Sequence, residues 1–362
     1  MKALIVFNHP APYKVRGFNE LSKYVELDVI FERQSAKNRP RSFYNTNDYR
    51  FNVMFLKRGA FCNENSNTKE LINYLKRNHT KYDHIIMNGY STFTEMRAIR
   101  YMNKNNIKFI LMINGGLIKK ETKLKRKIKQ NFISSAQYYL SPSKEADDYL
   151  IYYGANKENI FHYPYSSIYE KDILIKPLKV KEKMELRQRL GLPNNKIIIS
   201  CSQFIRRKNN LKLLEIFKDR KETLLLIGDG EEKEAYLEYI KTNNIINIII
   251  KPFLIRDDLL NYMKASDALI TLSKEDIYGH TILEAMAMGL PVISSNKVIS
   301  ALSLINNGVN GFKVNITDNK EINTAITRVD YSKMSQSSLN IIRNYTIEKT
   351  GLKLFEALEN IK

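Results

Sequence analysis

Short runs of aliphatic and β-branched residues alternate along the chain with segments whose apolar residues recur at helical spacing. In the first half, strands are predicted at residues 2–7, 29–31, 51–56, 84–87 and 108–113. Between them, residues 68–78 and 93–103 have the spacing of amphipathic helices. This alternation predicts an α/β fold with parallel strands, because a parallel pair needs a crossover connection.

Residues 166–195 interrupt this rhythm. They are charged, contain Pro177, Gly191 and Pro193, and leave room for one short helix at 180–190. A second alternation follows, with strands predicted at 196–201, 224–227, 245–250, 268–272 and 291–294, and the end of the chain, 332–361, is predicted to be helical. The pattern therefore indicates two Rossmann-like units joined by an interdomain region.

Composition narrows the class of protein. With 362 residues and 43% hydrophobic content, each unit can bury its own core, so a mainly disordered chain is not expected. Only Cys62 and Cys201 are present, which excludes a disulfide framework and a Cys-rich zinc module and suggests a reducing cytoplasm. No apolar run approaches the ~18 to 20 residues that span a bilayer. Residues 1–8 are too short for a signal-peptide core and are interpreted as a first strand.

The net charge of +20 is uneven: residues 1–180 hold 31 basic and 16 acidic side chains, and 181–362 hold 27 and 22. Leu124, Ile128 and Phe132 form an apolar stripe in the most basic segment, which predicts an amphipathic helix. The helix could be a solvated face docked by its stripe or could bind acidic lipid. Nucleic acid is not expected, because no recognisable binding module is present. The basic residues are Lys119, Lys120, Lys123, Lys125, Arg126, Lys127 and Lys129.

The segment 267–296 is the most informative for chemistry. It predicts a strand, a glycine-containing loop, a helix and a second strand, with Asp276 and Glu284 eight residues apart and Thr281 as a helix N-cap. A strand-to-helix turn offers N–H groups and the positive end of a helix dipole to an anion such as a pyrophosphate. Glu284, one turn into the helix, could accept hydrogen bonds from a ribose diol. The alternative is that Glu284 forms a salt bridge and that residues 285–290 are ordinary packing.

This segment resembles the retaining glycosyltransferases of family 4, which have the GT-B fold. Their signature is two glutamates eight apart with an aromatic-glycine turn between them, then Glu-Ala-Met-Ala, a glycine and a Pro-Val strand. Residues 197–209 are similar to the family's strand and basic phosphate-binding loop, 227–230 to its Gly-Asp-Gly turn, and 304–314 to its Gly-Phe strand. The matching residues are Asp276, Tyr278, Gly279, Glu284, Ala285, Met286, Ala287, Gly289, Pro291 and Val292.

The resemblance implies two Rossmann-like domains facing each other across a cleft. Residues 1–175 would bind the acceptor, 176–344 would bind the nucleotide-sugar donor, and 345–362 would return to the first domain. It implies catalytic roles for Asp276, Glu284, Lys208 and Arg207, and donor contacts from Gln203, Arg206, Gly228, Tyr278, Gly279, His280, Thr281 and Ile282. Two positions depart from the family: Asp276 replaces its first glutamate, which Glu275 could compensate, and Gln203 stands where many members have Arg.

The implied reaction keeps the anomeric configuration of the sugar and uses no protein nucleophile. Neither a cofactor nor a metal is expected, because the chain has no Asp-x-Asp triplet and protein cations would stabilise the leaving diphosphate. A UDP-sugar is the expected donor and a saccharide or lipid-linked saccharide the expected acceptor. The acceptor candidates His9, Asn114, Gly115 and Gly116 follow predicted strands. The basic first half would hold the protein on the inner face of the cell membrane, so it is expected to be cytoplasmic and peripheral.

Three rival functions stay open at this stage. A nucleic-acid or anionic-polymer binder would explain the charge without catalysis. Another GT-B enzyme, such as a nucleotide-sugar epimerase or a phosphorylase, would share the fold but not the acidic and basic residues of the site. A nicotinamide-dependent dehydrogenase is disfavoured, because no G-x-G-x-x-G follows the first strand and the turn from Gly228 to Gly230 is too short to replace it.

Overall fold

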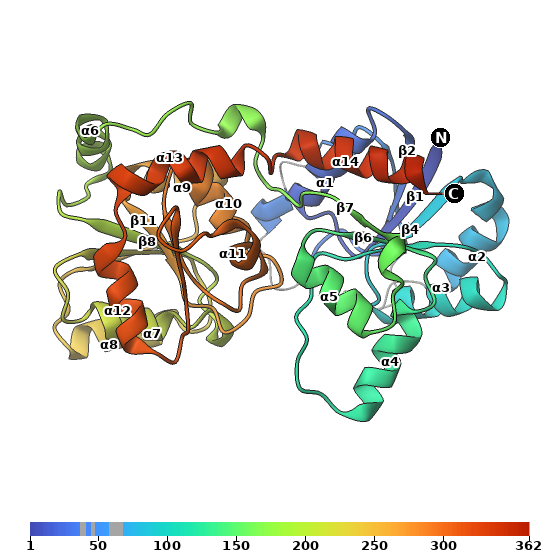
Figure 1. Cartoon of the computed structure of the whole chain (residues 1–362), viewed down its shortest axis with the longest axis horizontal. Helices are drawn as coiled ribbons and strands as arrows, with labels where there is room; N and C mark the ends of the chain where they lie inside the picture. Colours follow the sequence, from blue (N-terminus) through green and yellow to red (C-terminus); the bar gives the residue numbers. More distant parts are fainter. Residues whose placement is uncertain (37–40, 45–47, 58–67, 362) are drawn as a thin grey trace. The chain divides into compact units, whose positions relative to one another are not determined.

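The computed structural model describes residues 1–36, 41–44, 48–57 and 68–361. The chain forms two compact units, which we call unit 1 (residues 1–167 and 346–362) and unit 2 (residues 168–345) (Figure 1). Each unit is a parallel β-sheet whose strands alternate with helices. This confirms the α/β fold class predicted from the alternation of apolar runs.

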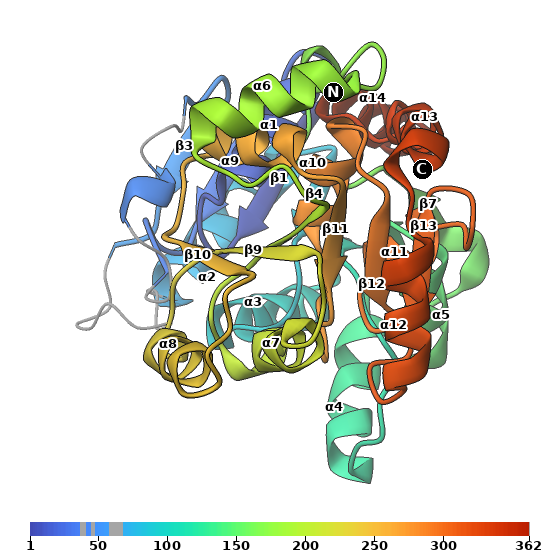
Figure 2. The same ribbon diagram turned by 90° about the vertical axis from the view of Figure 1, so that its left-hand side faces the viewer.

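Unit 2 contains a six-stranded parallel sheet in the order β10-β9-β8-β11-β12-β13. Figure 2 shows α7 and α8 on one face of this sheet and α9 and α10 on the other. The strands are β8 (Ile197–Cys201), β9 (Thr223–Ile227), β10 (Ile248–Lys251), β11 (Ala268–Thr271), β12 (Val292–Ser295) and β13 (Gly311–Val314). The helices are α6 (Val180–Leu190), α7 (Asn210–Phe217), α8 (Lys233–Thr242), α9 (Arg256–Ala265), α10 (His280–Ala287), α11 (Ile299–Leu304), α12 (Asn319–Arg328) and α13 (Tyr331–Ile342).

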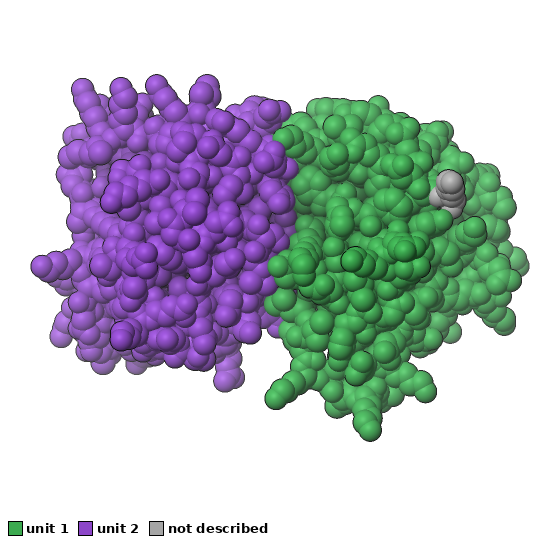
Figure 3. Space-filling view, viewed as in Figure 1, with its two compact units in different colours: residues 1–167, 346–362 green, residues 168–345 purple. Residues whose placement is uncertain are grey.

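The two units are coloured separately in Figure 3. The chain passes from unit 1 to unit 2 after Ser167 and returns to unit 1 at Thr346. The sequence predicted the first crossing between residues 175 and 176 and the return between residues 344 and 345. The helix predicted over 332–361 is in fact two helices, α13 and α14 (Ile347–Asn360), because the Thr346 side chain caps a new helix by accepting a hydrogen bond from the Lys349 N–H. The second of these helices packs alongside α1 (Pro12–Leu21) within unit 1.

Unit 1 contains a seven-stranded parallel sheet in the order β3-β2-β1-β4-β5-β6-β7. The last two strands were not predicted from the sequence. Both are short, and tyrosine, serine or histidine interrupts their apolar residues. The strands are β1 (Lys2–Phe7), β2 (Glu26–Phe31), β3 (Asn52–Phe55), β4 (His84–Met87), β5 (Ile110–Met112), β6 (Tyr138–Ser141) and β7 (Ile160–His162). The helices besides α14 are α1 (Pro12–Leu21), α2 (Thr68–Asn78), α3 (Phe93–Lys104), α4 (Lys123–Ile133) and α5 (Lys144–Tyr152).

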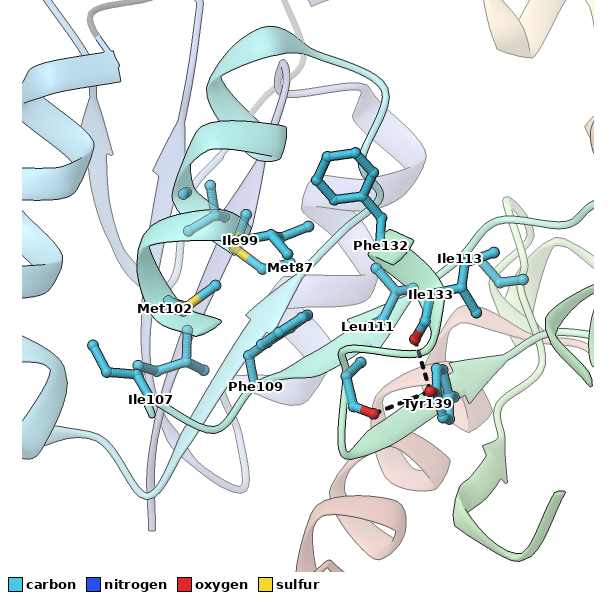
Figure 4. Close-up of a cluster of buried hydrophobic side chains, with 14 of the residues drawn as sticks. Met87, Ile99, Met102, Ile107, Phe109, Leu111, Ile113, Phe132, Ile133 and Tyr139 are labelled. Carbon is cyan, nitrogen blue, oxygen red and sulfur yellow. Dashed lines mark hydrogen bonds between the residues drawn. The ribbon is translucent and has the colours of Figure 1, made fainter. Parts of the chain in front are cut away.

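One side of the unit 1 sheet is covered by apolar residues of α3 and α4 (Figure 4). Ile99 and Phe132 are buried against side chains of the central strands such as Leu111. The buried Tyr139 hydroxyl donates hydrogen bonds to the carbonyl oxygens of Ile133 (2.7 Å) and Ala136 (3.0 Å). The end of α4 is thereby fixed to the start of β6.

Candidate active site

The predicted donor residues gather at the carboxyl ends of β8 and β11, which are neighbours in the unit 2 sheet. From β8 the chain moves outward to β9 and β10, and then returns to the other side of β8 to form β11. Such a reversal of strand order leaves a crevice where open α/β sheets bind ligands. Two loops border it, residues 202–209 after β8 and residues 272–279 after β11.

Polar contacts fasten these two loops to each other. Lys208 Nζ forms an ion pair with Asp276 Oδ2. The Arg207 guanidinium donates to the carbonyl oxygen of Glu275 (3.2 Å), and the Lys274 N–H donates to the carbonyl oxygen of Arg207 (2.8 Å). The two loops therefore form one polar surface, to which both the predicted cations and the predicted carboxylate belong.

The ion pair brings one of the two candidate carboxylates, Asp276, to the basic loop. The Lys208 and Asp276 side chains are only 13% and 19% exposed, so their attraction is screened less than that of a surface pair. Glu275 contacts the basic loop through its backbone carbonyl. The structure thus brings the aspartate of the motif to Lys208, while Arg206 and Arg207 are exposed beside it.

Helix α10 begins at the same edge of the sheet, but two residues earlier than predicted. Its N-cap is Gly279, with a φ of 91°, and Thr281 lies inside the first turn, so the prediction of Thr281 as N-cap is wrong. A Cβ at position 279 would lie 2.5 Å from Val298 and 3.1 Å from the Ser300 hydroxyl, and the positive φ also favours glycine. The first-turn N–H groups and the positive end of the helix dipole are therefore next to the loop that carries Asp276.

Glu284 is half-buried on α10, one turn after the helix starts. Its carboxylate is close enough to the end of β8 to affect Cys201: burial raises the pKa of that thiol, and the negative charge of Glu284 raises it further. Glu284 therefore lies near the carboxyl end of β8. An acid placed there can accept two hydrogen bonds from a diol.

The other predicted donor residues pack within unit 2 and shape the loops around the site. Tyr278 and Ile282 are buried, and the Tyr278 ring packs against His280 with a centroid distance of 5.2 Å. Gly228 allows the loop after β9 to approach the loop after β8, because a Cβ there would lie 1.9 Å from the Ser202 carbonyl oxygen. Gln203 is half-buried in the β8 loop. These residues shape the site, whereas Lys208, Asp276 and Glu284 supply its charges.

Sequence reasoning missed Asn209. This residue has a φ of 60°, a conformation that Asn tolerates better than most side chains, and its amide nitrogen donates to the Leu272 carbonyl oxygen (3.1 Å). It therefore turns the chain between Lys208 and α7 while joining both loops. An asparagine after three basic residues was the available signal.

The predicted acceptor residues lie in unit 1. His9, after β1, is half-buried, and its Nδ1 is 3.2 Å from the Tyr44 hydroxyl. Asn114 follows β5, and its Oδ1 is 3.5 Å from the amide nitrogen of Asn88, a residue that the sequence reading did not select. A Cβ at Gly116 would lie 2.5 Å from the Tyr149 ring, and Gly115 has a φ of 139°. The strand between β1 and β5 is β4, so Asn88 at its end lies between the two predicted groups.

The basic amphipathic helix is α4, preceded by Lys119 and Lys120. Its predicted stripe is not buried as a whole: Phe132 is buried, but Leu124 is 70% exposed and Ile128 is 41% exposed. The interpretation as a face docked by its stripe is therefore wrong for the first two turns, which extend beyond the other elements of unit 1 (Figures 1 and 2). Lys129 differs from the other basic residues, because it is paired with Glu121 (2.6 Å).

Within the ranges given above, no three His, Cys, Asp or Glu side chains are grouped as metal ligands would be. None of the helices described is long and apolar enough to cross a membrane. Cys201 is a free buried thiol, and Cys62 lies outside the described residues.

Comparison with known proteins gives the same fold, and the match to a family model lies almost entirely in unit 2. The family model described as Glycosyl transferases group 1 matches residues 182–349. The O-antigen biosynthesis glycosyltransferase WclY of Escherichia coli is 28% identical over 157 residues, which are 42% of this chain and 42% of that protein. The N-acetyl-alpha-D-glucosaminyl L-malate synthase of Bacillus anthracis is 29% identical over 146 residues, 38% of this chain and 37% of that protein. The similarity thus spans less than half the length of these curated relatives.

The likeness in structure extends over the whole chain. Anabaena HepE, solved in complex with UDP, has a TM-score of 0.77 at 17% sequence identity, and the match covers 100% of both chains. At this identity the comparison shows the fold alone. The chain therefore has the two-domain α/β fold of the GT-B glycosyltransferases, and residues 182–349 match the group 1 glycosyl transferases within that fold.

Proposed function

We propose that the protein is a retaining, metal-independent glycosyltransferase of family 4 that transfers a sugar from a UDP-sugar to a saccharide or lipid-linked saccharide acceptor. The observation that carries the proposal is the meeting of Lys208, Asp276 and the start of α10 at the switch point of unit 2. The match of residues 182–349 to the group 1 glycosyl transferases supports it. The relatives named in O-antigen and lipopolysaccharide biosynthesis suggest a cell-surface glycan as product.

In this proposal unit 2 binds the donor through charge. Lys208, with Arg206 and Arg207 beside it, and the N–H groups of the first turn of α10 hold the diphosphate, and Glu284 accepts hydrogen bonds from the ribose diol. The HepE structures with UDP and UDP-glucose support uridine as the base. Asp276 contacts the transferred sugar, since it is already held at the edge of the crevice by Lys208.

The reaction needs stabilisation of a leaving group more than a protein base. The acceptor hydroxyl oxygen forms a bond to the anomeric carbon as the bond from that carbon to the diphosphate breaks on the same face. The departing diphosphate oxygen takes the hydroxyl proton, so atoms and charge balance without a protein nucleophile. Lys208 and Arg207 would stabilise the negative charge that develops on the diphosphate, which is the usual source of large rate effects.

The experiment is a transfer assay with a panel of nucleotide sugars and methyl glycosides as acceptors, in the presence and absence of EDTA. We expect a product of retained configuration from one UDP-sugar, with a rate that EDTA leaves unchanged. Loss of activity in EDTA that Mn²⁺ restores would overturn metal independence. Epimerised donor without transfer would favour the epimerase alternative instead.

The exposed part of α4 completes the proposal by supplying a partner surface. Lys123, Lys125 and Lys127 alternate there with the exposed Leu124 and Ile128. A helix with lysines around exposed aliphatic side chains fits the interface of a bilayer that contains acidic lipids. We place unit 1 on the inner face of the cell membrane by this surface, where lipid-linked acceptors are available.

A further inference from the structure

The amine of Lys14 is enclosed within unit 1 without a group that balances its charge. Lys14 is 3% exposed in the first turn of α1, and none of the described residues offers its amine a hydrogen-bonding oxygen. Its contacts are Met112 Sδ at 3.8 Å and aromatic rings, of which Tyr165 is nearest at 4.3 Å. Burying an unpaired ammonium is costly, so this environment favours the neutral amine. Burial accordingly lowers the pKa of Lys14 from 10.5 to about 7.

A cavity of about 10 Å³ lies beside the amine, and α14 forms one of its walls. The wall consists of Thr350 and Leu354, which are 4% and 2% exposed. The other titratable groups in the lining are the phenols of Tyr13, Tyr163 and Tyr165, and none of the lining residues is an acid. A space of this size holds about one water molecule. The amine therefore cannot be hydrated as an ammonium while α14 is in place.

The position of α14 depends on its close contact with α1, beside which it lies (Figure 1). A Cβ at Gly351 would lie 2.4 Å from the Glu20 Cβ, and the Tyr24 and Phe355 rings stack at 5.1 Å. Glu20 is the charged group of α1 at this contact, and it is paired with Lys23 (2.5 Å). Helix α14 joins none of the strands of the sheet to one another, so it can separate from α1 by local opening without breaking the sheet.

A second titratable side chain touches the other end of α14. His84, at the start of β4, is half-buried and forms a hydrogen bond with the Leu358 backbone. Burial lowers the pKa of His84 by more than this hydrogen bond and the nearby Asp83 raise it. Separation of α14 would therefore let both His84 and the amine on α1 bind protons more readily.

We propose that α14 is a pH-sensitive latch on unit 1: docked, it keeps water from the Lys14 amine, and when it separates from α1 the amine takes up a proton from the solvent. Between about pH 7 and pH 10.5 the docked form holds the neutral amine and the open form the ammonium, so acid favours opening. Below this range His84 acts in the same direction. The latch is independent of the proposed function, since none of its residues belongs to the candidate donor site.

Hydrogen–deuterium exchange of the full chain, followed by mass spectrometry, tests the latch. Peptides of α14 and β4 are compared at pH 7.5 and pH 8.5 after correction for the intrinsic exchange rate. We expect the protection of α14 to be about eightfold lower at pH 7.5, because opening takes up one proton, and the protection of β4 to stay the same. Lys14→Met should remove the pH dependence. The control Lys104→Met, at an exposed position on α3, should retain it.

A second variant separates docking from titration and keeps the test decisive if Lys14→Met does not fold. Leu354→Ala removes buried contacts of α14 but leaves the amine, so it should raise the exchange of α14 at both pH values and keep their ratio. Equal protection of wild-type α14 at the two pH values overturns the latch, as does a pH dependence that Lys14→Met retains. A loss of protection shared by β4 also overturns it, because unit 1 would then unfold as a whole.

Discussion

The candidate site depends on single residues that join loops distant in the sequence. Lys208 and Asp276 are 68 positions apart, and their ion pair holds a cation beside the first turn of α10. Removing one partner of a poorly solvated pair leaves the other charge uncompensated. The Lys208→Ala substitution is therefore expected to affect the position of Asp276 as well as the binding of a diphosphate.

A different lysine, Lys14 on α1, is expected to control the pH dependence of unit 1 stability. It is 3% exposed, 3.8 Å from Met112 Sδ and 4.3 Å from the centre of the Tyr165 ring, at the wall of a cavity of about 10 Å³. Burial lowers the pKa of Lys14 from 10.5 to about 7. Between these values the unfolded chain holds a proton that the folded chain lacks, so the free energy of unfolding rises with pH.

The Lys14→Met substitution should remove this dependence. We expect the stability of the wild-type unit 1 to increase by about 2 kcal/mol from pH 7.5 to pH 9, at about 1.4 kcal/mol per pH unit for one group, and that of the variant to stay flat. Urea denaturation at the two pH values, followed through the unit 1 transition, measures the difference. Equal slopes for the two proteins would show that Lys14 stays charged when buried.

Lys14 also marks the limit of prediction from sequence at this scale. Next to Tyr13 and two residues before Arg16, it resembles an ordinary exposed base, and only the three-dimensional packing of Phe18 and Tyr165 around it reveals its burial. Asp276 and Glu284 were predictable, because their spacing belongs to a motif. The N-cap at Gly279 was not, because it depends on the approach of Val298 from a later loop.

At the scale of elements, the strands that lie in the sheet centres were predicted well. Parallel strands buried on both faces are continuous apolar runs, as in β1 and β8, and such runs are easily recognised. Strands β6 and β7 were missed because tyrosine, serine and histidine interrupt their apolar character. The break between α13 and α14 was missed because Thr346 acts as a cap only once the chain has changed units.

The contact between the loops after β8 and β9 should be sensitive to a single methyl group. Gly228→Ala places a Cβ 1.9 Å from the Ser202 carbonyl oxygen, whereas Gly191→Ala, also at a positive φ, meets nothing within 4 Å. We expect Gly191→Ala to cost roughly 1 kcal/mol from backbone strain alone. Gly228→Ala should cost more than about 3 kcal/mol in unit 2 stability, because backbone must move as well. Equal melting temperatures for the two variants would contradict this account of Gly228.

Helix α4 gives a prediction for the membrane surface. Leu124→Asp places a charge where we expect acyl chains, and Leu237→Asp on α8 is the control, since Leu237 is 43% exposed in unit 2. In co-sedimentation with vesicles containing phosphatidylserine, we expect wild type and control to bind and Leu124→Asp to bind several-fold more weakly. Binding that is the same for all three proteins, or the same for neutral vesicles, would remove α4 from the proposed surface.

At the scale of the whole molecule, charge divides between the two halves of the sequence. The first 180 residues carry a net +15 and the remaining 182 carry +5, from 31 basic and 16 acidic against 27 basic and 22 acidic side chains. Unit 2 needs only a few cations at one switch point to bind a diphosphate. Unit 1 carries the exposed basic helix α4, which fits an acceptor that has an anionic anchor.

The most direct measurement of the central claim is UDP binding to unit 2 in the full chain, by calorimetry and thermal melting. The proteins compared are the wild type, Glu284→Gln and the control Glu234→Gln, a substitution at an exposed position on α8. UDP at about 100 times its dissociation constant should stabilise the wild type and the control by about 2.7 kcal/mol. Glu284→Gln should lose at least tenfold in affinity, because charge-assisted hydrogen bonds to the ribose are lost. If Glu284→Gln binds UDP and transfers sugar as the wild type does, the donor site is not where we have placed it.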